Sequence, residues 1–425
     1  MLDIRLITEK TEYVKQALAK RGGTFNLEGI ISLDKQRREI ITKTEGLKAK
    51  RNSVTQEISL LKRAKQNADG LIEQMGAVGE EIKELDAKLA QIESQLKEEA
   101  AALPNMPDDD IVSGGKENNE VIKIVGQKPQ FAFETKNHVD LCTSLGLIDY
   151  ERGAKLGGSG YWIYTDRGAV LEWALLNYFV EQHLADGYKF ILPPHMLNYA
   201  CGFGAGQFPK FAEDVYWIEE NGSKSQFMLP TAETALVNLY AGEILPQKAL
   251  PSKMFAYTPC YRKEAGSHRT EERGMIRGHQ FNKVEMFCFS HPENSGEAFA
   301  ELVQKASGLV ENLGLHFRVS KLAAGDISAS MARTYDIEVW LPSMGIYKEI
   351  SSVSNSNDYQ ARRNNTRFRE ESSGRIRFVH TLNGSGLATS RLIPAIVEQC
   401  QNPDGSVNVP LPLQKRTGFA KIEKK

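Results

Sequence analysis

Apolar residues recur at helical spacing along the first hundred residues of the chain. Leu33, Ile40, Leu47, Val54 and Leu61 are seven residues apart. A second series alternates spacings of three and four and consists of Met75, Val78, Ile82, Leu85, Leu89, Ile92 and Leu96. Both spacings are typical of coiled-coil seams. The polar stretch KQNADG lies between the two series and ends in Gly70, which favours a chain reversal. The pattern therefore predicts a long antiparallel helical coiled coil over roughly residues 33–102.

The two predicted helices carry opposite charge. Residues 34–65 contain ten Lys or Arg and four acidic residues, whereas residues 71–102 contain eight acidic residues and three Lys. This difference would let the helices pair through positions that flank the seam. Alternatively, the surplus on the first helix would face a polyanion. Composition does not separate these alternatives. With about 32 residues at 1.5 Å per residue, the first helix would be about 48 Å long.

The pattern changes after residue 103. Residues 104–120 are rich in Pro, Asp and Gly and are expected to form a linker. Beyond them, a helical stretch at 171–185 alternates with strand-like runs, which are SKMFAYTPCYRKE, KVEMFCFS, TYDIEVWLP and IRFVHTL. Several runs follow one another without a long helix between them, which favours a mainly antiparallel β-sheet flanked by helices. We therefore expect an α+β chain with an N-terminal domain at 1–103 and a second domain at 121–425.

Composition excludes several classes of protein. The net charge of −1 and pI near 6.7 exclude a globally basic nucleic-acid binder, although not a local basic surface. The five cysteines form no CxxC pair and the eight histidines no HxxxH spacing, so we expect neither a disulfide framework nor zinc. No apolar run approaches the ~20 residues that span a bilayer. The N-terminus mixes charges of both signs, unlike a signal peptide, and we expect a cytoplasmic protein.

Charged residues mark the ends of two of the predicted strands. Because side chains alternate between the faces of a strand, Arg262 and Glu264 share a face, as do Phe281, Lys283 and Glu285. If the strands pair as a hairpin, these side chains would gather on one sheet face. A core would not accept unpaired charges, but a ligand with a phosphate, a planar ring and an ammonium group would suit them. The alternative is a solvated sheet face with surface ion pairs.

Three other segments suggest binding chemistry but also have ordinary structural explanations. HTLNGSGLATSR predicts a glycine-containing turn between a strand and a helix, with Arg391 in the first helical turn. PTAE, which ends at Glu233, predicts a helix start with Thr231 as the cap. EISS places Glu349 and Ser352 three residues apart, and a carboxylate with a hydroxyl could hold Mg²⁺ beside phosphates. Alone, each segment is weak evidence.

Taken together, these segments resemble the class II aminoacyl-tRNA synthetases, and specifically the seryl-tRNA synthetases. YRKEAG…GMIRGHQFNKVE is similar to the second class II motif and NGSGLATSR to the third. GAVLEWALLNYFVEQHLADGYKFILPP resembles the first motif, a long helix and a strand that end in proline, here Pro193. This motif builds the dimer interface in that class. PTAE, EISSVSNSNDYQARR and the coiled-coil arm are more particular to the seryl enzymes. The resemblance extends from Met1 to about Gly418.

The resemblance implies an activity and a set of partners. The enzyme would ligate L-serine to its tRNA through a seryl-adenylate, with ATP and Mg²⁺ and without zinc. The partners would be tRNA(Ser), a second copy of the chain in a homodimer and, as a family expectation, tRNA(Sec), but no membrane. The N-terminal domain would bind tRNA through its arm, and residues 121–425 would be the catalytic domain.

The resemblance also assigns residues to roles. Arg262, Glu285 and Arg391 would be catalytic, with Arg262 contacting the α-phosphate of ATP and the carboxylate of serine. Besides Arg262 and Glu285, the serine site would comprise Thr231, Ala232, Glu233, Asn383 and Ser385. Besides Arg262 and Arg391, the ATP site would comprise Lys263, Glu264, Met275, Ile276, Phe281, Glu349, Ile350, Ser351 and Ser352. Phe281 and Arg391 would enclose the adenine, and Glu349 and Ser352 would hold Mg²⁺. Arg269, Arg273 and Arg277 are candidates for phosphate contacts in the loop.

Two rival interpretations remain, and the sequence departs from the family pattern in places. A catalytically silent paralogue would have lost some of Arg262, Glu264, Phe281, Glu285 and Arg391, and all five are present. A ligase that loads an amino acid onto a carrier protein would lack the arm. The departures are RGH for RQH at Gly278, TAETAL for TAEVPL at Thr234, GLATSR for GLAVGR at Ser390 and GFGAGQFPKF for GTGQLPKF. They leave open the shape of the ATP loop and the response to serine-like inhibitors.

Overall fold

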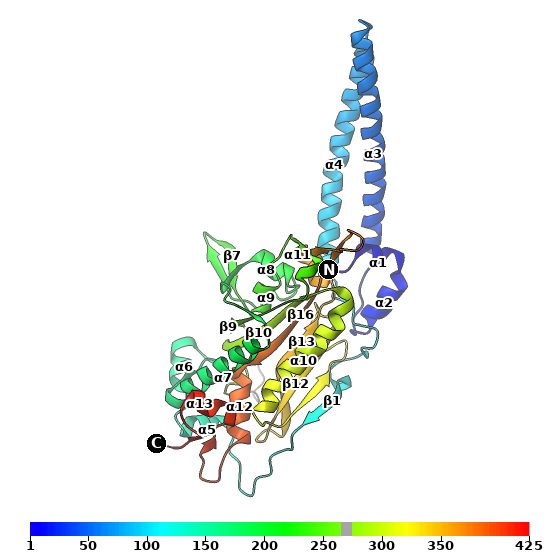
Figure 1. Cartoon of the computed structure of the whole chain (residues 1–425). Coiled ribbons are helices and arrows are strands. Elements are labelled where there is room, and N and C mark those ends of the chain that lie inside the picture. The colour runs from blue at the N-terminus through cyan, green and yellow to red at the C-terminus, as the bar shows by residue number, and fades with distance from the viewer. Residues whose placement is uncertain (265–273, 425) are drawn as a thin grey trace. The chain divides into compact units, whose positions relative to one another are not determined.

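The structure, a computed structural model, describes residues 1–264 and 274–424. The chain divides into two compact units (Figure 1). The first comprises Met1–Ala19 and Gly23–Pro104, and the second comprises Lys20–Gly22 and Asn105–Lys425. Across the described ranges, every helix is too short or too polar to cross a membrane.

The first unit is helical. Its elements are α1 (Ile4–Glu9), α2 (Thr11–Ala19), α3 (Glu28–Arg63) and α4 (Asp69–Ala102). The long helices α3 and α4 form the predicted hairpin (Figure 1). Met75, Val78 and Ile82 are buried in its seam and pack with partly buried apolar residues of α3, namely Leu47, Val54 and Ile58. The predicted seam is therefore confirmed. Helix α3 starts earlier than expected, and its 36 residues make it about 54 Å long.

Ion pairs join the two helices of the hairpin across the seam. Lys43 Nζ lies 2.7 Å from Glu81 Oε1, and Lys48 Nζ lies 3.1 Å from Asp86 Oδ1. All four side chains are exposed to about the same degree, between 43% and 58%. The opposite charges of the helices therefore serve their pairing at these positions. Other cations of α3, such as Lys50, remain exposed.

An eight-stranded sheet forms the framework of the second unit. Its order is β1-β11-β12-β13-β16-β10-β9-β4, and neighbours are antiparallel except for the parallel pair β4–β9. The strands are β1 (Glu120–Val125), β11 (Phe317–Lys321), β12 (Arg333–Leu341), β13 (Ile346–Asn355), β16 (His380–Ala388), β10 (Gln280–Ser290), β9 (Ser252–Tyr261) and β4 (Lys189–Ile191). This architecture confirms the predicted α+β fold with a mainly antiparallel sheet.

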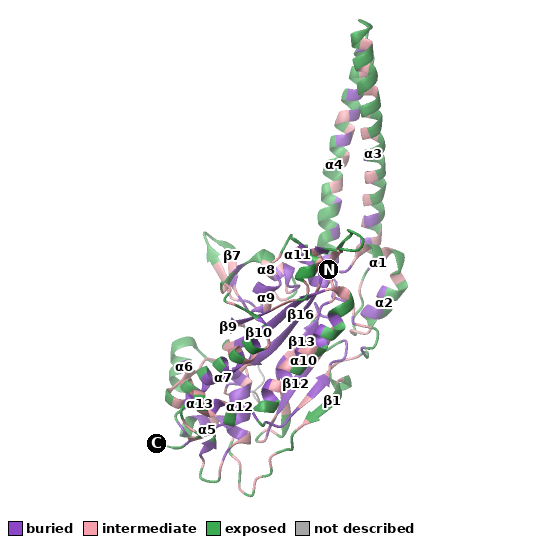
Figure 2. Ribbon diagram, in the orientation of Figure 1, coloured by how far each residue is buried: buried purple, intermediate pink, exposed green. Residues whose placement is uncertain are grey.

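Helices and small sheets surround this framework. The helices are α5 (His138–Ser144), α6 (Tyr150–Gly157), α7 (Asp166–Ala185), α8 (Tyr199–Gly204), α9 (Glu233–Leu236), α10 (Ser295–Asn312), α11 (Tyr359–Asn364), α12 (Thr389–Gln399) and α13 (Leu411–Thr417). The shorter strands are β2 (Ile148–Asp149), β3 (Ile163–Tyr164), β5 (Met196–Asn198), β6 (Trp217–Glu220), β7 (Ser223–Met228), β8 (Ile244–Pro246), β14 (Arg367–Arg369), β15 (Ile376–Phe378), β17 (Val407–Asn408) and β18 (Lys421–Ile422). Figure 2 shows that the central strands β10 and β16 are largely buried, whereas the solvent sides of the helices are exposed.

The register of β10 sorts its side chains onto two faces. Val284 and Met286 belong to the main core, which also contains apolar residues of α7, α10 and α12. Phe281, Lys283 and Glu285 alternate with them and pair with Cys260, Thr258 and Ala256 of β9, respectively. Directly paired residues of antiparallel strands share a face. The predicted β-hairpin of β9 and β10 is therefore confirmed, and so is the shared face of Phe281, Lys283 and Glu285.

The glycine run of the third motif differs from the prediction. Residues 383–386 lie inside strand β16, not in a turn after a strand. A side chain on Gly384 would come within 3.0 Å of Val353, and one on Gly386 would overlap His183. Glycine in a strand often marks such a close approach, so its usual association with turns was misleading here. Arg391 does lie in the first turn of the following helix, α12.

Two other segments also differ from the expectation. Residues 105–120, expected as most of a linker, belong to the second unit. Asn105 is buried there, and its side-chain amide donates to the carbonyls of Ser330 and Ser356. At PTAE, helix α9 has only four residues, and Ala232, not Thr231, is at its N-cap position. The hydroxyl of Thr231 accepts from the backbone N–H of Glu233 at 3.4 Å and from Lys283 at 2.8 Å.

Candidate active site

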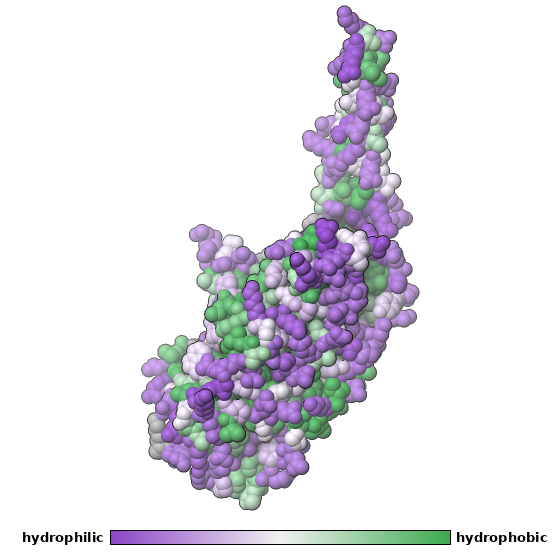
Figure 3. All heavy atoms as spheres, in the orientation of Figure 1, coloured by the Kyte–Doolittle hydropathy of each residue, from purple (hydrophilic) through white to green (hydrophobic). Residues whose placement is uncertain are grey.

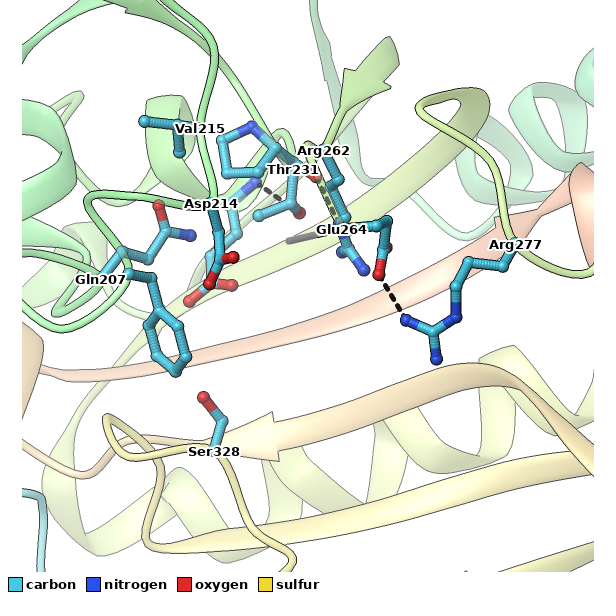
Figure 4. Close-up of a pocket in the computed structure, with 11 residues that line it drawn as sticks. Gln207, Asp214, Val215, Thr231, Arg262, Glu264, Arg277 and Ser328 are labelled. Carbon is cyan, nitrogen blue, oxygen red and sulfur yellow. Dashed lines mark hydrogen bonds and ion pairs between the residues drawn. The ribbon is translucent and has the colours of Figure 1, made fainter. Parts of the chain in front are cut away.

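Two adjoining cavities open on the face of β9 and β10 that carries the charged residues. The larger, of about 450 Å³, is shown in Figure 4 and is lined by Gln207, Phe211, Asp214, Val215, Pro230, Thr231, Glu233, Arg262, Glu264, Arg277 and Ser328. The smaller, of about 60 Å³, shares Arg262, Glu264 and Arg277 with it. Its other lining residues include Ile276, Phe281, Lys283, Glu349, Ile350, Ser385 and Arg391. Ten of the predicted site residues therefore line one of these cavities or both.

Arg262 lies where the two cavities meet. It follows directly after β9, and its backbone N–H donates to the carbonyl of His279 at 2.9 Å. Its Nε donates to the carbonyl of Pro230 at 3.3 Å, and its guanidinium carbon lies 5.2 Å from the ring centroid of Phe281. These contacts hold a planar cation over an aromatic ring, an arrangement that suits recognition of carboxylate or phosphate.

A buried ion pair lies beside Arg262. Lys283 Nζ is 2.5 Å from Glu285 Oε2, and the two side chains are only 7% and 2% exposed. Lys283 also donates to Thr231 Oγ1 at 2.8 Å, and Ser385 Oγ donates to Glu285 at 3.3 Å. Desolvated charges are costly unless they are paired and hydrogen-bonded. The sequence interpretation noted Lys283 on this face but gave it no role, although strand alternation was the signal that identified it.

Glu233 is held by a residue that the sequence interpretation missed. The side-chain amide of Gln360, on α11, donates to Glu233 Oε1 at 2.7 Å and to the carbonyl of Ala205 at 3.0 Å. The Gln360 carbonyl oxygen accepts from Thr381 Oγ1 at 2.6 Å. Burial, helped by the negative charge of Glu285, raises the pKa of Glu233 to about 7. No spacing or periodicity in the sequence identifies Gln360.

Arg391 joins the third motif to Glu349. Its Nη1 donates to the backbone carbonyl of Glu349 at 2.8 Å and to Oε2 at 3.2 Å. Its Nε donates to the carbonyl of Ile276 at 3.0 Å. Burial alone would raise the pKa of Glu349, but the positive charges of Arg391 and Arg262 outweigh it, and the pKa lies below its usual value. Glu349 is therefore a carboxylate near neutral pH.

A β-bulge brings Glu349 and Ser352 to the same face. Ser352 pairs with Asp336 and Glu349 with Glu338, so β13 has one more residue than β12 between these two pairs. In a regular strand, residues three apart would point to opposite faces. The Ser352 hydroxyl donates to Asp336. Burial, followed by the negative charge of Glu349, raises the pKa of Asp336 well above its usual value.

This arrangement fits a divalent cation shared with phosphates. Mg²⁺ needs only one or two carboxylates when waters and phosphate oxygens complete its coordination. Glu349 supplies a carboxylate and Ser352 a hydroxyl, and a cation would relieve the repulsion that Asp336 experiences from Glu349. Within residues 1–264 and 274–424, no group of three or more His, Cys, Asp or Glu side chains is arranged to hold a metal.

The remaining predicted residues line neither cavity. Ala232 is buried in a second apolar cluster and Met275 in the main core, so only their backbones are available for contacts. Lys263 is exposed, and Ser351 Oγ donates to the carbonyl of Ser385 at 2.6 Å. Asn383 is buried, with its amide 3.8 Å from the Met331 sulfur. Glu285 and Ser352 also line neither cavity, and they contact the site residues Lys283, Ser385 and Asp336 as described above. Their assigned roles stay predictions.

The loop candidates fall into two groups. Arg269 and Arg273 lie outside the described residues. Arg277 is described and forms an ion pair with Glu264, drawn as a dashed line in Figure 4. Both side chains line the two cavities, so this pair faces the space where a ligand would lie.

The departures from the family pattern have local partners. A side chain on Gly278 would overlap the ring of Trp162, so glycine at this position makes room for that ring. Thr234 Oγ1 donates to Gln207 Oε1 at 3.0 Å. Ser390 lines the smaller cavity beside Arg391. These three departures thus fit their surroundings without displacing a charged residue of the site.

Two family models match the chain. The model of the seryl-tRNA synthetase N-terminal domain matches residues 1–107, and the model of the tRNA synthetase class II core domain (G, H, P, S and T) matches residues 216–400. Serine–tRNA ligase 2 of Clostridium acetobutylicum is 55% identical over 425 residues, which cover 99% of this chain and 100% of that protein. The serine–tRNA ligase of Macrococcus caseolyticus is 44% identical, with coverage of 96% and 97%.

Solved structures agree with these matches. The seryl-tRNA synthetase from Pyrococcus horikoshii complexed with ATP superposes with a TM-score of 0.94 at 33% identity, and the match covers both chains fully. The cytoplasmic serine–tRNA ligase from Naegleria fowleri in complex with AMP gives a TM-score of 0.88 at 25% identity, covering 100% of this chain and 99% of the other.

Proposed function

Since the chain belongs to the seryl-tRNA synthetases, within the class II aminoacyl-tRNA synthetases, we propose that it activates serine as a seryl-adenylate in the two adjoining cavities. The chain is a class II ligase that joins serine to tRNA in an ATP-dependent reaction. The adenylate step is supported by one observation above all. Arg262 lies between a cavity that contains Thr231 and Glu233 and a cavity that contains Phe281 and Arg391.

In the proposed reaction, a serine carboxylate oxygen attacks the α-phosphorus of ATP. A new O–P bond forms, the bond between the α-phosphorus and the bridging oxygen breaks, and pyrophosphate leaves. Arg262 is placed to bind both the attacking carboxylate and the α-phosphate, so it positions the reactants and offsets the negative charge of the transition state. Pre-set donors of this kind need no reorganisation during the reaction, because the contacts of Arg262 to His279 and Pro230 already hold it.

Serine recognition would use the buried polar residues next to Arg262. Glu233 and Thr231 would hold the ammonium group of serine. Glu285 and Ser385 would form hydrogen bonds with the serine hydroxyl. A pocket that hydrogen-bonds a substrate hydroxyl strongly rejects analogues that lack it, because its own buried groups would be left unpaired. Alanine and glycine should fail for this reason. Threonine keeps the hydroxyl, so only the shape of the pocket excludes it.

The smaller cavity would take the adenosine end of ATP. Phe281 offers a ring for stacking, Arg391 a guanidinium for the opposite side, and Glu264 a carboxylate for the adenine amino group. Glu349 and Ser352 would hold Mg²⁺, which supplies positive charge to neutralise the phosphates. These roles rest on the shared lining of the cavity and on the bulge in β13.

The hairpin would bind tRNA(Ser), and tRNA(Sec) is a second proposed acceptor. The visible face of the hairpin is mainly hydrophilic in Figure 3. Residues 34–65, most of which belong to α3, carry six more positive than negative charges. Lys43 and Lys48 among them pair with α4. The surplus is suited to a phosphate backbone. A cytoplasmic location remains part of the proposal.

A homodimer is also part of the proposal. Large apolar side chains are exposed on α7 and on and after β4, and Trp173 and Leu192 are 57% and 71% exposed. Val170, Leu184, Phe190, Met196 and Tyr199 are exposed in the same segments. Clusters of exposed apolar residues mark interaction sites in soluble proteins, and all of these residues except Met196 and Tyr199 fall on the segment that resembles the dimer-forming motif.

Mass spectrometry of the enzyme incubated with ATP, Mg²⁺ and serine in the absence of tRNA tests the adenylate step. We expect seryl-adenylate bound to the protein, and serine transferred to tRNA(Ser) when that tRNA is added. Serylation of tRNA that proceeds without a detectable adenylate would contradict the proposed intermediate. A bound adenylate that serylates a carrier protein but no tRNA would favour the carrier-protein ligase.

A further inference from the structure

A carboxyl group on helix α7 is buried behind the active-site face of the sheet. Glu172 is 5% exposed, and its Oε1 accepts hydrogen bonds from Asn282 Nδ2 and Thr389 Oγ1, both at 2.7 Å. Among the described residues, its second oxygen, Oε2, is buried without a hydrogen-bond partner, and so is the hydroxyl of Tyr164. Carboxyl groups are rarely buried to this extent without a role. Glu172 contributes no atom to either cavity.

The two partners of Glu172 lie next to the proposed ATP site. Asn282 is the residue of β10 between Phe281 and Lys283, and it points to the opposite face. Its amide is held at both ends, because its Oδ1 accepts from the Tyr257 hydroxyl at 3.2 Å. Thr389 is the first residue of α12, two before Arg391, and its hydroxyl also lies 3.3 Å from the Asn282 carbonyl.

One carboxyl oxygen therefore joins three elements. A shift of β10 or of the start of α12 by one hydrogen-bond length would break a bond to Glu172 and leave buried polar groups unpaired, which costs about 1–3 kcal/mol for each group. Phe281 and Lys283 depend on the position of β10, and Arg391 depends on the start of α12. These three side chains line the smaller cavity.

We propose that Glu172 is a positioning residue for ATP, because it fixes β10 and α12 to α7 and so sets the spacing of Phe281 and Arg391. The proposal rests on the function proposed above, in which these two residues enclose the adenine. Glu172 acts through Asn282 and Thr389 and does not touch the nucleotide. Its removal should affect ATP more than serine, since both residues proposed to enclose the adenine depend on this network, whereas Glu233 is held from α11 by Gln360.

The ionisation of Glu172 supports the proposal. Burial raises its pKa to about 7, against the interactions with Asn282, Thr389 and Tyr164, which lower it. The other titratable groups that face it are Tyr164 on β3 and Tyr257 on β9, and burial raises the pKa of both, so they stay neutral. Below about pH 7, the proton of Glu172 can satisfy Oε2 by donation to Tyr164. Above it, Glu172 is a buried negative charge, which burial disfavours even though the Tyr164 hydroxyl can donate to it.

The test uses the full-length chain and three variants. Glu172→Ala removes the hydrogen-bond network. Glu172→Gln keeps an acceptor at the position of Oε1 and places an N–H donor at the position of Oε2. Tyr178→Phe is the matched control. Tyr178 lies on the same helix and is buried, and its hydroxyl donates to the Leu309 carbonyl, away from the site. The measurements are thermal unfolding, calorimetric ATP binding, and KM for ATP and for serine in ATP–pyrophosphate exchange.

We expect E172A to raise KM for ATP by about tenfold, the effect of about 1.4 kcal/mol, with KM for serine changed less than twofold. E172Q should restore KM for ATP, and Y178F should change neither constant. As pH rises from 6 to 8, KM for ATP should increase more in the wild type than in E172Q, because only the wild type acquires a buried charge at residue 172. The absence of ATP effects in a folded E172A, or equal rises in both KM values, would overturn the proposal.

Two further outcomes keep the test decisive. If E172A does not fold, the comparison of E172Q with the wild type decides, and parallel pH profiles for ATP would overturn the proposal. If the wild type binds ATP but shows no exchange with serine, the proposed function fails. In that case the calorimetric ATP affinities of the variants still decide the role of Glu172.

Discussion

The hairpin and the catalytic sheet use charged residues in opposite ways. Lys48 and Asp86 pair across the hairpin while 44% and 47% exposed, whereas Lys283 and Glu285 pair in the site at 7% and 2%. Exposed pairs gain little, because water and salt screen them. Buried pairs are strong only in one geometry and become costly when one partner is lost. The hairpin is thus suited to a long, adaptable contact with a polyanion, and the site to one small ligand in one orientation.

Removal of the hairpin would separate the two regions most sharply. A variant in which a Gly-Ser turn replaces residues 34–97 should lose about 10³-fold in kcat/KM for tRNA serylation, the order of several lost phosphate contacts. ATP–pyrophosphate exchange with serine should stay within twofold of the full chain. Parallel losses in both assays would show that the hairpin supports the catalytic unit and does not serve tRNA alone.

Arg262→Ala should have the next largest effect. Loss of a pre-set cation at the reacting phosphate lowers kcat by about 10²–10³-fold, and exchange in the absence of tRNA is the direct measurement. Arg152, which is exposed and pairs with Asp149 at 2.7 Å, provides the control, and Arg152→Ala should leave exchange unchanged. An R262A enzyme with the wild-type rate would exclude the assigned role.

Two lysine substitutions compare the ion pairs directly. Lys283→Met should lower the free energy of unfolding by about 3–5 kcal/mol, because it leaves Glu285 buried without its partner. Lys48→Met, at the exposed pair, should change it by less than about 1 kcal/mol. Urea unfolding of the two variants beside the wild type measures both. Similar losses in the two variants would mean that burial does not distinguish the regions.

The pH dependence of serine binding should be the smallest effect. With a pKa near 7, Glu233 is neutral below that pH and negative above it, so its charge is available to the substrate ammonium group only at higher pH. KM for serine should therefore fall by about tenfold at most between pH 6 and 8. Glu233→Gln should abolish this dependence. A wild-type KM that is constant or rises over this range would remove Glu233 from the ammonium site.

The hairpin was predictable because its pattern is local. Seam residues such as Ile82 and Leu96 follow helical spacing over several turns, and helical spacing alone determines which side is buried. The charged face of β10 was also predictable, since alternation along one strand places Lys283 beside Glu285. Its partner strand was inferred correctly because the second motif contains both strands.

Other parts of the site depend on contacts that no local pattern records. Glu349 and Ser352 share a face only because β13 contains a bulge, and Gln360 reaches Glu233 from a helix 127 residues away in sequence. Gly386 indicated a turn, but it lies in a strand at a place where a side chain would overlap His183. Long-range packing overrides local propensity in these cases.

ATP–pyrophosphate exchange with serine, threonine, alanine and glycine, in the absence of tRNA, tests the central claim most directly. The claim is that buried charges around Arg262 activate serine and read its hydroxyl without help from the hairpin. We expect exchange with serine alone. Exchange with alanine or glycine at a rate comparable to that with serine would contradict the assignment of Glu285 and Ser385, and the absence of exchange with all four amino acids would contradict the adenylate mechanism.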